Sequence, residues 1–212
     1  MKKLSFLFLL LLFSFGFAQT YQFDFLTKYS SKDSQHELAR EFVTYNNSDD
    51  FSYYLHLKKS DSDFTANLYD HKSNLAHNFD VRESTVDGKI QFQFTYVNTS
   101  RLQSGGSKNY RYEFSEISDS PKMVLLKIYS SKKAKKPVAE KLMTLEKANK
   151  NLIPIYRSGW LHQYSDYENV FKVGDYIVSN SVEKFKKDTC ESKLQEYKNV
   201  DLQIILPTKL KL

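Results

Sequence analysis

The segment from Asn78 to Val97 constrains the fold most, because its turn chemistry and its side-chain alternation require the same hairpin. Asp87-Gly88 tolerates positive φ and fits a two-residue turn. Side chains alternate along a strand, so folding at this turn collects apolar residues on one face. The register pairs Val86 with Lys89, Val81 with Phe94 and Phe79 with Tyr96. The apolar face carries Phe79, Val81, Ile90, Phe92, Phe94 and Tyr96. The sequence therefore predicts an antiparallel sheet with one dry and one hydrated face.

Similar alternations recur along the chain between clusters of polar turn residues, and Val200 to Leu206 forms a final β run. This spacing predicts a mainly β fold: a large curved antiparallel sheet, half-barrel or barrel-like, with one to three short helices. One expected helix covers Leu161 to Asn169. A second is expected near the end of the chain, on the helical spacing of Cys190, Leu194 and Tyr197. The stretch from Val138 to Leu145 fits a strand or a short helix.

The first residues have the features of a signal peptide. Lys2 and Lys3 precede an apolar run from Leu4 to Phe13, and Gly16-Phe17-Ala18 is a small-x-small cleavage site. The run is shorter than the roughly 20 residues of a spanning helix, which disfavours an uncleaved anchor. We therefore expect residues 1–18 to be removed after Ala18. Residues 19–212 then form a single β-rich domain that is periplasmic or secreted.

Charge and cysteine content narrow the class of protein further. The formal net charge of the full sequence is +6 at pH 7, and its basic residues are spread along the chain. Neither this spread nor export favours nucleic acid as a partner. Cys190 is the only cysteine, so no intrachain disulfide is expected. We interpret it as a small buried hydrophobe.

The motifs that carry chemistry in other proteins are absent or incomplete. The sequence contains no G-x-S-x-G elbow, no P-loop and no dinucleotide fingerprint. A calcium loop beginning at Asp61 would need Gly where Ala66 stands and Glu where Lys72 stands. His71 and His77 are six residues apart, which matches no standard zinc spacing. We therefore predict no metal, no cofactor and no catalytic residue, hence a protein that is not an enzyme.

One basic cluster is a candidate for contact with a membrane surface. It consists of Lys132, Lys133, Lys135 and Lys136. Each lysine near an anionic surface contributes about 1 kcal/mol of binding. The alternative is a solvated hairpin tip whose charges prevent pairing between sheet edges.

The tail of the chain resembles a family of small exported bacterial proteins. It contains Tyr176-Ile177-Val178, then Leu194 to Val200, then Leu202-Gln203-Ile204-Ile205-Leu206-Pro207, and this order resembles the ends of GLPGLI-type proteins. The layout of many strands with short helical pieces is also similar to the outer-membrane lipoprotein carriers. That similarity implies a curved half-barrel wrapped over helices, with acyl chains held in the hollow.

These observations predict an exported, non-enzymatic protein that binds a lipophilic or envelope-derived ligand on the concave face of its sheet. The predicted ligand-binding residues are the six apolar residues of the hairpin: Phe79, Val81, Ile90, Phe92, Phe94 and Tyr96. The same face could instead be a filled core, because protein interiors are close-packed. The alternative function is an envelope or cell-surface interaction module that uses exposed tyrosines.

Overall fold

The computed structural model describes residues 19–34, 39–60, 63–87, 89–102, 111–156, 173–185 and 188–212. Its strands form one antiparallel sheet in the order β6-β5-β4-β3-β2-β1-β11-β10-β9-β8-β7. The strands are β1 (Thr20–Asp33), β2 (Arg40–Asn46), β3 (Tyr53–Lys59), β4 (Phe64–Asp70), β5 (Leu75–Val86), β6 (Lys89–Arg101), β7 (Arg111–Asp119), β8 (Lys122–Tyr129), β9 (Ala139–Lys147), β10 (Tyr176–Phe185) and β11 (Asp188–Ile205). The predicted mainly β fold with a large curved antiparallel sheet is therefore confirmed.

The β5–β6 hairpin has the predicted register, with Phe79 opposite Tyr96 and Val81 opposite Phe94. Asp87 has a φ of 50°, which the predicted turn requires. The pairing continues past the turn-proximal residues to Leu75 and Arg101, after one irregularity between Asn78 and Phe79. Turn chemistry and alternation were sufficient to predict this hairpin.

The helical predictions are less accurate than the hairpin prediction. The helix placed around Cys190 and Tyr197 is wrong, because both residues lie in strand β11. The stretch from Val138 to Leu145 belongs largely to strand β9, and Leu161 to Asn169 lie outside the described residues. Within the described ranges, the helical structure is one 3₁₀ turn, η1 (Ile153–Ile155). No helix in those ranges is long and apolar enough to cross a membrane.

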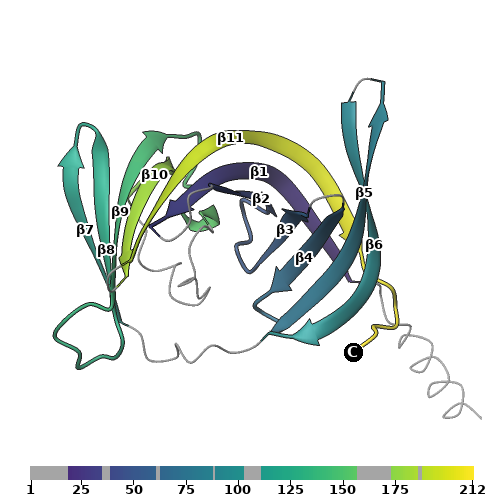
Figure 1. Cartoon of the computed structure of the whole chain (residues 1–212), viewed down its shortest axis with the longest axis horizontal. Helices are drawn as coiled ribbons and strands as arrows, with labels where there is room; N and C mark the ends of the chain where they lie inside the picture. The colour runs from purple at the N-terminus through teal and green to yellow at the C-terminus, as the bar shows by residue number, and fades with distance from the viewer. Residues whose placement is uncertain are drawn as a thin grey trace, which may run out of the picture.

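Strands β1 and β11 form a long central pair that arches over the molecule (Figure 1). Strands β2 to β6 lie on one side of this pair and form the N-terminal half. Strands β7 to β10 lie on the other side and form the C-terminal half. The 3₁₀ turn η1 lies beneath the arch (Figure 1). We call the face of the central pair that carries Phe25, Thr27 and Tyr29 the arch face.

The N-terminal half curls until strands that are not neighbours touch. The hydroxyl of Tyr21 on β1 donates to Asp70 on β4 over 2.7 Å. The rings of Tyr45 on β2 and Phe94 on β6 meet edge to face. The segment after β11 crosses to β6, where the carbonyl of Lys211 accepts from the backbone N–H of Thr99. The core enclosed by this curl includes Phe23, Leu26, Leu55, Leu57, Leu68, Phe79, Val81 and Ile204.

The C-terminal half builds its core against η1 and its neighbour Tyr156. The ring of Tyr29 packs on that of Tyr156 with centroids 4.9 Å apart, and its hydroxyl donates to the carbonyl of Val178. Alternate residues of β8 and β9 fill the space below. This core includes Tyr29, Val124, Leu126, Ile128, Met143, Leu145, Ile153, Tyr156 and Val178.

The two halves bury opposite faces of the same sheet. Residues directly opposite in an antiparallel pair share a face. Ser31 of β1 lies on the arch face, and it is linked by the row Ser192, Ser181, Met143 and Val124 to the C-terminal core. Leu26 points from the other face, and it is linked by the row Tyr45, Leu55 and Leu68 to the N-terminal core. The buried face therefore changes within the central pair.

Candidate functional site: a pocket beneath the arch

Strands β10 and β11 diverge and leave a fork in the sheet. They pair only between residues 180–185 and 188–193. Beyond Lys193, β11 continues with β1 as its partner, whereas β10 continues beside β9. The start of β10 is instead bonded to the segment after β9, since Leu152 donates its N–H to the carbonyl of Tyr176. The fork opens on the arch face.

Two irregularities in the β1–β11 pairing orient the side chains at this fork. Register shifts fall between Phe23 and Phe25 and between Lys28 and Tyr29. Between the shifts, Tyr197 lies opposite Thr27 and Asn199 lies opposite Phe25. Opposite residues share a face, so Tyr197 and Asn199 point from the arch face.

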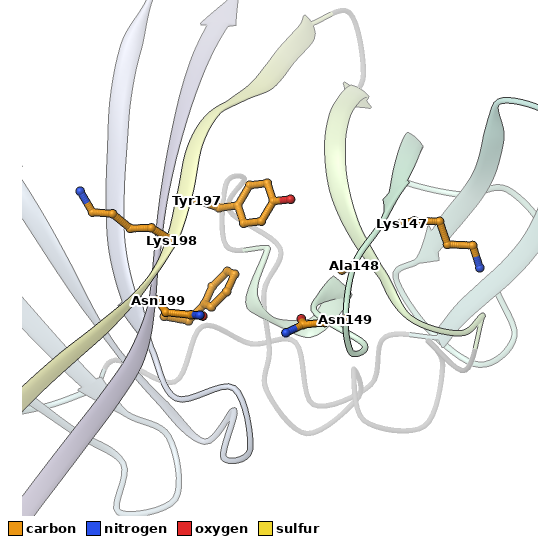
Figure 2. Close-up of a pocket in the computed structure, with 7 residues that line it drawn as sticks. Lys147, Ala148, Asn149, Tyr197, Lys198 and Asn199 are labelled. Carbon is orange, nitrogen blue, oxygen red and sulfur yellow. The ribbon is translucent and has the colours of Figure 1, made fainter.

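The fork holds a pocket of about 310 Å³. This volume is at the lower end of the roughly 300–1,000 Å³ of small-molecule sites, so it suits part of an elongated ligand. The pocket lies where the two halves meet, and β11 and the segment after β9 bound it (Figure 2). Its lining residues are Phe25, Lys147, Ala148, Asn149, Tyr197, Lys198 and Asn199.

Two aromatic rings form the apolar part of the pocket. Phe25 and Tyr197 stack with ring centroids 5.9 Å apart and an interplanar angle of 27°. Phe25 is 4% exposed and anchored in the small core formed with Leu152, Ile155 and Ile177. Tyr197 is 45% exposed, although the strand residue opposite it, Thr27, is fully buried. The Tyr197 ring is thus a large aromatic surface presented to the space beneath the arch.

The six predicted ligand-binding residues lie elsewhere. Phe79 and Val81 are buried in the N-terminal core, and Phe92, Phe94 and Tyr96 are partly buried against it. Ile90 is 63% exposed near the hairpin turn. None of the six lines the pocket at the fork. Whether a ligand enters between them stays a prediction.

A buried ion pair lies in the C-terminal half. Lys141 is 1% exposed and Glu183 5%, and their side chains approach to 2.9 Å from Nζ to Oε2. The ammonium group also lies 5.2 Å from the centre of the Tyr156 ring. Cys190 is opposite Glu183 and half-buried, and burial followed by the Glu183 charge raises the pKa of its thiol. These features favour a protonated, unreactive thiol.

The N-terminal half contains a buried hydrogen-bond chain in place of an ion pair. The Tyr21 hydroxyl lies 2.7 Å from Asp70 and 3.3 Å from Nε2 of His77, whose Nδ1 is 2.8 Å from the Thr99 hydroxyl. Burial lowers the pKa of His77, against the attraction of Asp70. Burial alone would raise the pKa of Asp70, but hydrogen bonds from Ser73 and Tyr21 outweigh it and lower that pKa. Because each of these polar groups has a hydrogen-bond partner, they are tolerated in a core.

The remaining candidates have ordinary positions. His71 and His77 are not brought together: the His71 ring stacks on Tyr54, whereas His77 belongs to the buried chain. In the part of the chain that the structure describes, no group of three His, Cys, Asp or Glu residues is placed to hold a metal ion. The four lysines from Lys132 to Lys136 are exposed in the turn between β8 and β9.

Sequence reasoning missed the residues of the pocket. Tyr197 was assigned to a helix, and Phe25 is not among the predicted ligand-binding residues. Asn149 and Asn199 carry no motif. The available signal was the change of alternation in β11, where the positions on the arch face pass from even numbers up to Leu194 to the odd number of Tyr197. Such a change marks a bulge.

No family model and no curated protein matches the chain, so the similarity of the tail to GLPGLI-type proteins has no support. A LolA superfamily protein from Nitrosomonas europaea superposes with a TM-score of 0.32 and 8% identity, over 85% of this chain and 87% of that one. A putative outer membrane lipoprotein-sorting protein domain from Vibrio parahaemolyticus gives 0.25 and 9%, over 83% and 85%. Both names agree with the predicted similarity of layout to the outer-membrane lipoprotein carriers.

Proposed function

We propose that this chain is an exported, non-enzymatic binding protein that holds the apolar part of an amphipathic ligand in the pocket beneath the arch. Export is inferred from the N-terminal sequence, which lies outside the described residues. The lipophilic character of the ligand is inferred from the pocket. The proposal keeps the predicted concave location and moves the contact residues to Phe25 and Tyr197.

The exposure of Tyr197 is the observation that carries the proposal. An aromatic ring that is half-exposed inside a hollow keeps apolar surface in contact with water. A ligand that covers this surface would bind favourably. The stacked partner Phe25 is fixed in a core, so the pair provides a preformed apolar wall. Preformed sites lose less entropy on binding. An acyl chain or another elongated apolar group fits a wall of this kind.

Displacement of a neutral fluorescent probe, N-phenyl-1-naphthylamine, tests the proposal. The processed protein should enhance the fluorescence of the probe, and Tyr197→Ala should weaken probe binding about tenfold, since one aromatic wall is lost. Ile205→Ala is the matched control, because Ile205 is also a large apolar residue of β11, 60% exposed and outside the pocket. Equal binding by Tyr197→Ala and the unsubstituted protein would refute the proposed site.

Co-purification gives a second test that needs no chosen probe. Native mass spectrometry of the protein from its own host should show an added mass, and solvent extraction should release an amphiphile. The Tyr197→Ala protein should lose that mass while Ile205→Ala keeps it. A protein that never carries an adduct and binds no probe would argue against a carrier.

One observation favours the alternative function of an interaction module. The β5–β6 hairpin projects beyond the rest of the sheet (Figure 1), with Val86 and Ile90 45% and 63% exposed near its turn. Exposed apolar residues on a projecting element suit contact with another protein. A photo-crosslinker at Ile90 should then capture one stoichiometric envelope protein in intact cells, and a crosslinker at Lys59 should not.

A further inference from the structure

The charged residues at the pocket point away from it. Lys198 lies opposite Leu26, whereas Asn199 lies opposite Phe25, so alternation places the Lys198 side chain on the face away from the arch. Its ammonium group is 2.7 Å from the carboxylate of Glu196. Figure 2 shows the Lys198 side chain directed away from Tyr197. Only the base of this residue borders the pocket.

The ammonium group of Lys147 contacts an aromatic ring outside the pocket. Its Nζ lies 4.2 Å from the centre of the Tyr176 ring, at cation–π distance. In Figure 2 its ammonium group points away from Asn149 and Tyr197. Neither lysine that borders the pocket therefore offers its charge to a ligand inside it.

The polar groups that do border the space, as far as the described residues extend, are neutral. They are the carboxamides of Asn149 and Asn199, which approach it from opposite sides, together with the Tyr197 hydroxyl (Figure 2). Among the described residues, neither carboxamide has a hydrogen-bond partner in the protein. Each amide supplies both donors and an acceptor. A hydroxyl or amide of a ligand can donate a hydrogen bond to the carboxamide oxygen and accept one from the carboxamide N–H.

We infer that the polar part of the ligand is uncharged, a hydroxyl or amide next to an apolar chain, and that Asn149 and Asn199 bind it. The inference rests on the proposed function. An ionised carboxylate in this space would lose water without gaining a cation, which is unfavourable. An ammonium group would find no carboxylate among the described residues that line the pocket. A monoacylglycerol or an acyl amide meets the requirements.

Competition between amphiphiles of equal chain length tests the inference. 1-Lauroylglycerol and lauramide should displace N-phenyl-1-naphthylamine at about tenfold lower concentration than laurate or dodecylammonium, because they alone complete the amide hydrogen bonds. The double variant Asn149→Leu with Asn199→Leu should weaken 1-lauroylglycerol about tenfold and leave laurate unchanged. Lys58→Gln with Lys59→Gln, both outside the pocket, should alter neither.

The outcomes separate this inference from the function beneath it. If laurate displaces the probe as well as 1-lauroylglycerol does, and Lys147→Gln or Lys198→Gln weakens laurate, then a lysine binds the headgroup. The inference is then overturned, while the pocket keeps its function. If no amphiphile displaces the probe, or the probe does not bind, the proposed function itself is overturned. Circular dichroism of each variant establishes that it is folded.

Discussion

The two halves of the sheet reach a closed core by different routes. In the N-terminal half the sheet curls on itself, and strands β1 and β4 meet across the interior. In the C-terminal half the sheet is covered by η1 and Tyr156, on the opposite face. A strand therefore has no inherent buried face: curvature and the neighbouring elements decide which face is buried. The buried polar groups differ as well, with an ion pair in one half and a hydrogen-bond chain in the other.

Breaking the ion pair between Lys141 and Glu183 should have the largest effect on stability. Lys141→Met should destabilise the protein by about 3–5 kcal/mol, because Glu183 keeps a buried charge with no cation beside it. Adding Glu183→Leu should recover most of that loss, since replacing both partners by apolar residues is often neutral. Urea denaturation measures both. A single variant as stable as the unsubstituted protein would contradict the assigned role of the pair.

The hydrogen-bond chain should respond less strongly. Tyr21→Phe removes the hydroxyl that Asp70 accepts from, and it should cost about 1–3 kcal/mol, the range for an unmet buried hydrogen bond. The pKa of Asp70 should rise towards its ordinary value, so this variant should lose less stability on acidification than the unsubstituted protein does. Denaturation at several pH values between neutral and acidic checks both results. Unchanged acid sensitivity would mean that Tyr21 does not support Asp70.

Acidification should destabilise the N-terminal half before the C-terminal half. Burial, with help from Lys58, lowers the pKa of His56 to about 4, so His56 is neutral in the folded N-terminal half. The unfolded chain takes up this proton near pH 6.5. The stability that neutral His56 contributes to the folded state is thus present above about pH 6.5 and is lost as the pH falls towards 4. The free energy of unfolding should fall by about 1 kcal/mol by pH 5.

Hydrogen exchange locates this loss. The amides of β3 and β4 should exchange faster at pH 5 than the same amides of the His56→Gln variant, after correction for intrinsic rates. The described residues of the C-terminal half contain no histidine, so β8 and β9 serve as the internal control. Equal acceleration in both halves would show that they open together.

The smallest effect on stability is expected at the lysine turn of the C-terminal half. Replacing Lys132, Lys133, Lys135 and Lys136 by Gln should change the free energy of unfolding by less than about 0.5 kcal/mol, since all four are exposed. The same protein should bind less to vesicles containing phosphatidylglycerol, because each lysine contributes about 1 kcal/mol at an anionic surface. Lys58→Gln with Lys59→Gln is the control in the N-terminal half. Equal vesicle binding by all three proteins would exclude this turn as the contact.

The sequence predicted local β structure well and the position of the pocket poorly. The Asp87 turn and the alternation around Phe94 act over short distances, so a single segment contains the information needed. His56 alternates with the apolar Leu55 and Leu57, and this pattern alone would place it on the hydrated side of its strand. It is half-buried against Phe42, because that side faces the space beneath the arch. Burial of this kind depends on curvature, which no single strand encodes.

The error at the end of the chain has a specific cause. Cys190 and Leu194 share a face through strand alternation, and the register shift beside Lys28 brings Tyr197 to the same face. Spacings of four and then three residues result, and these are also the spacings of a helix. A bulged strand can thus imitate a helical pattern. The same bulge creates the pocket, so the feature that defeated the prediction is the one that positions the site.

The order of the strands has a consequence for how the chain assembles. Every strand pairing except β1 with β11 joins strands that follow one another in the chain. Two meanders can therefore form early and independently, while the pairing of β1 with β11 must wait for the 18 residues of the last strand. Until then β1 has an open edge of the kind that invites aggregation. A chain interrupted before Asp188 would yield two unjoined half-sheets, and a factor that shields β1 during synthesis would speed productive folding.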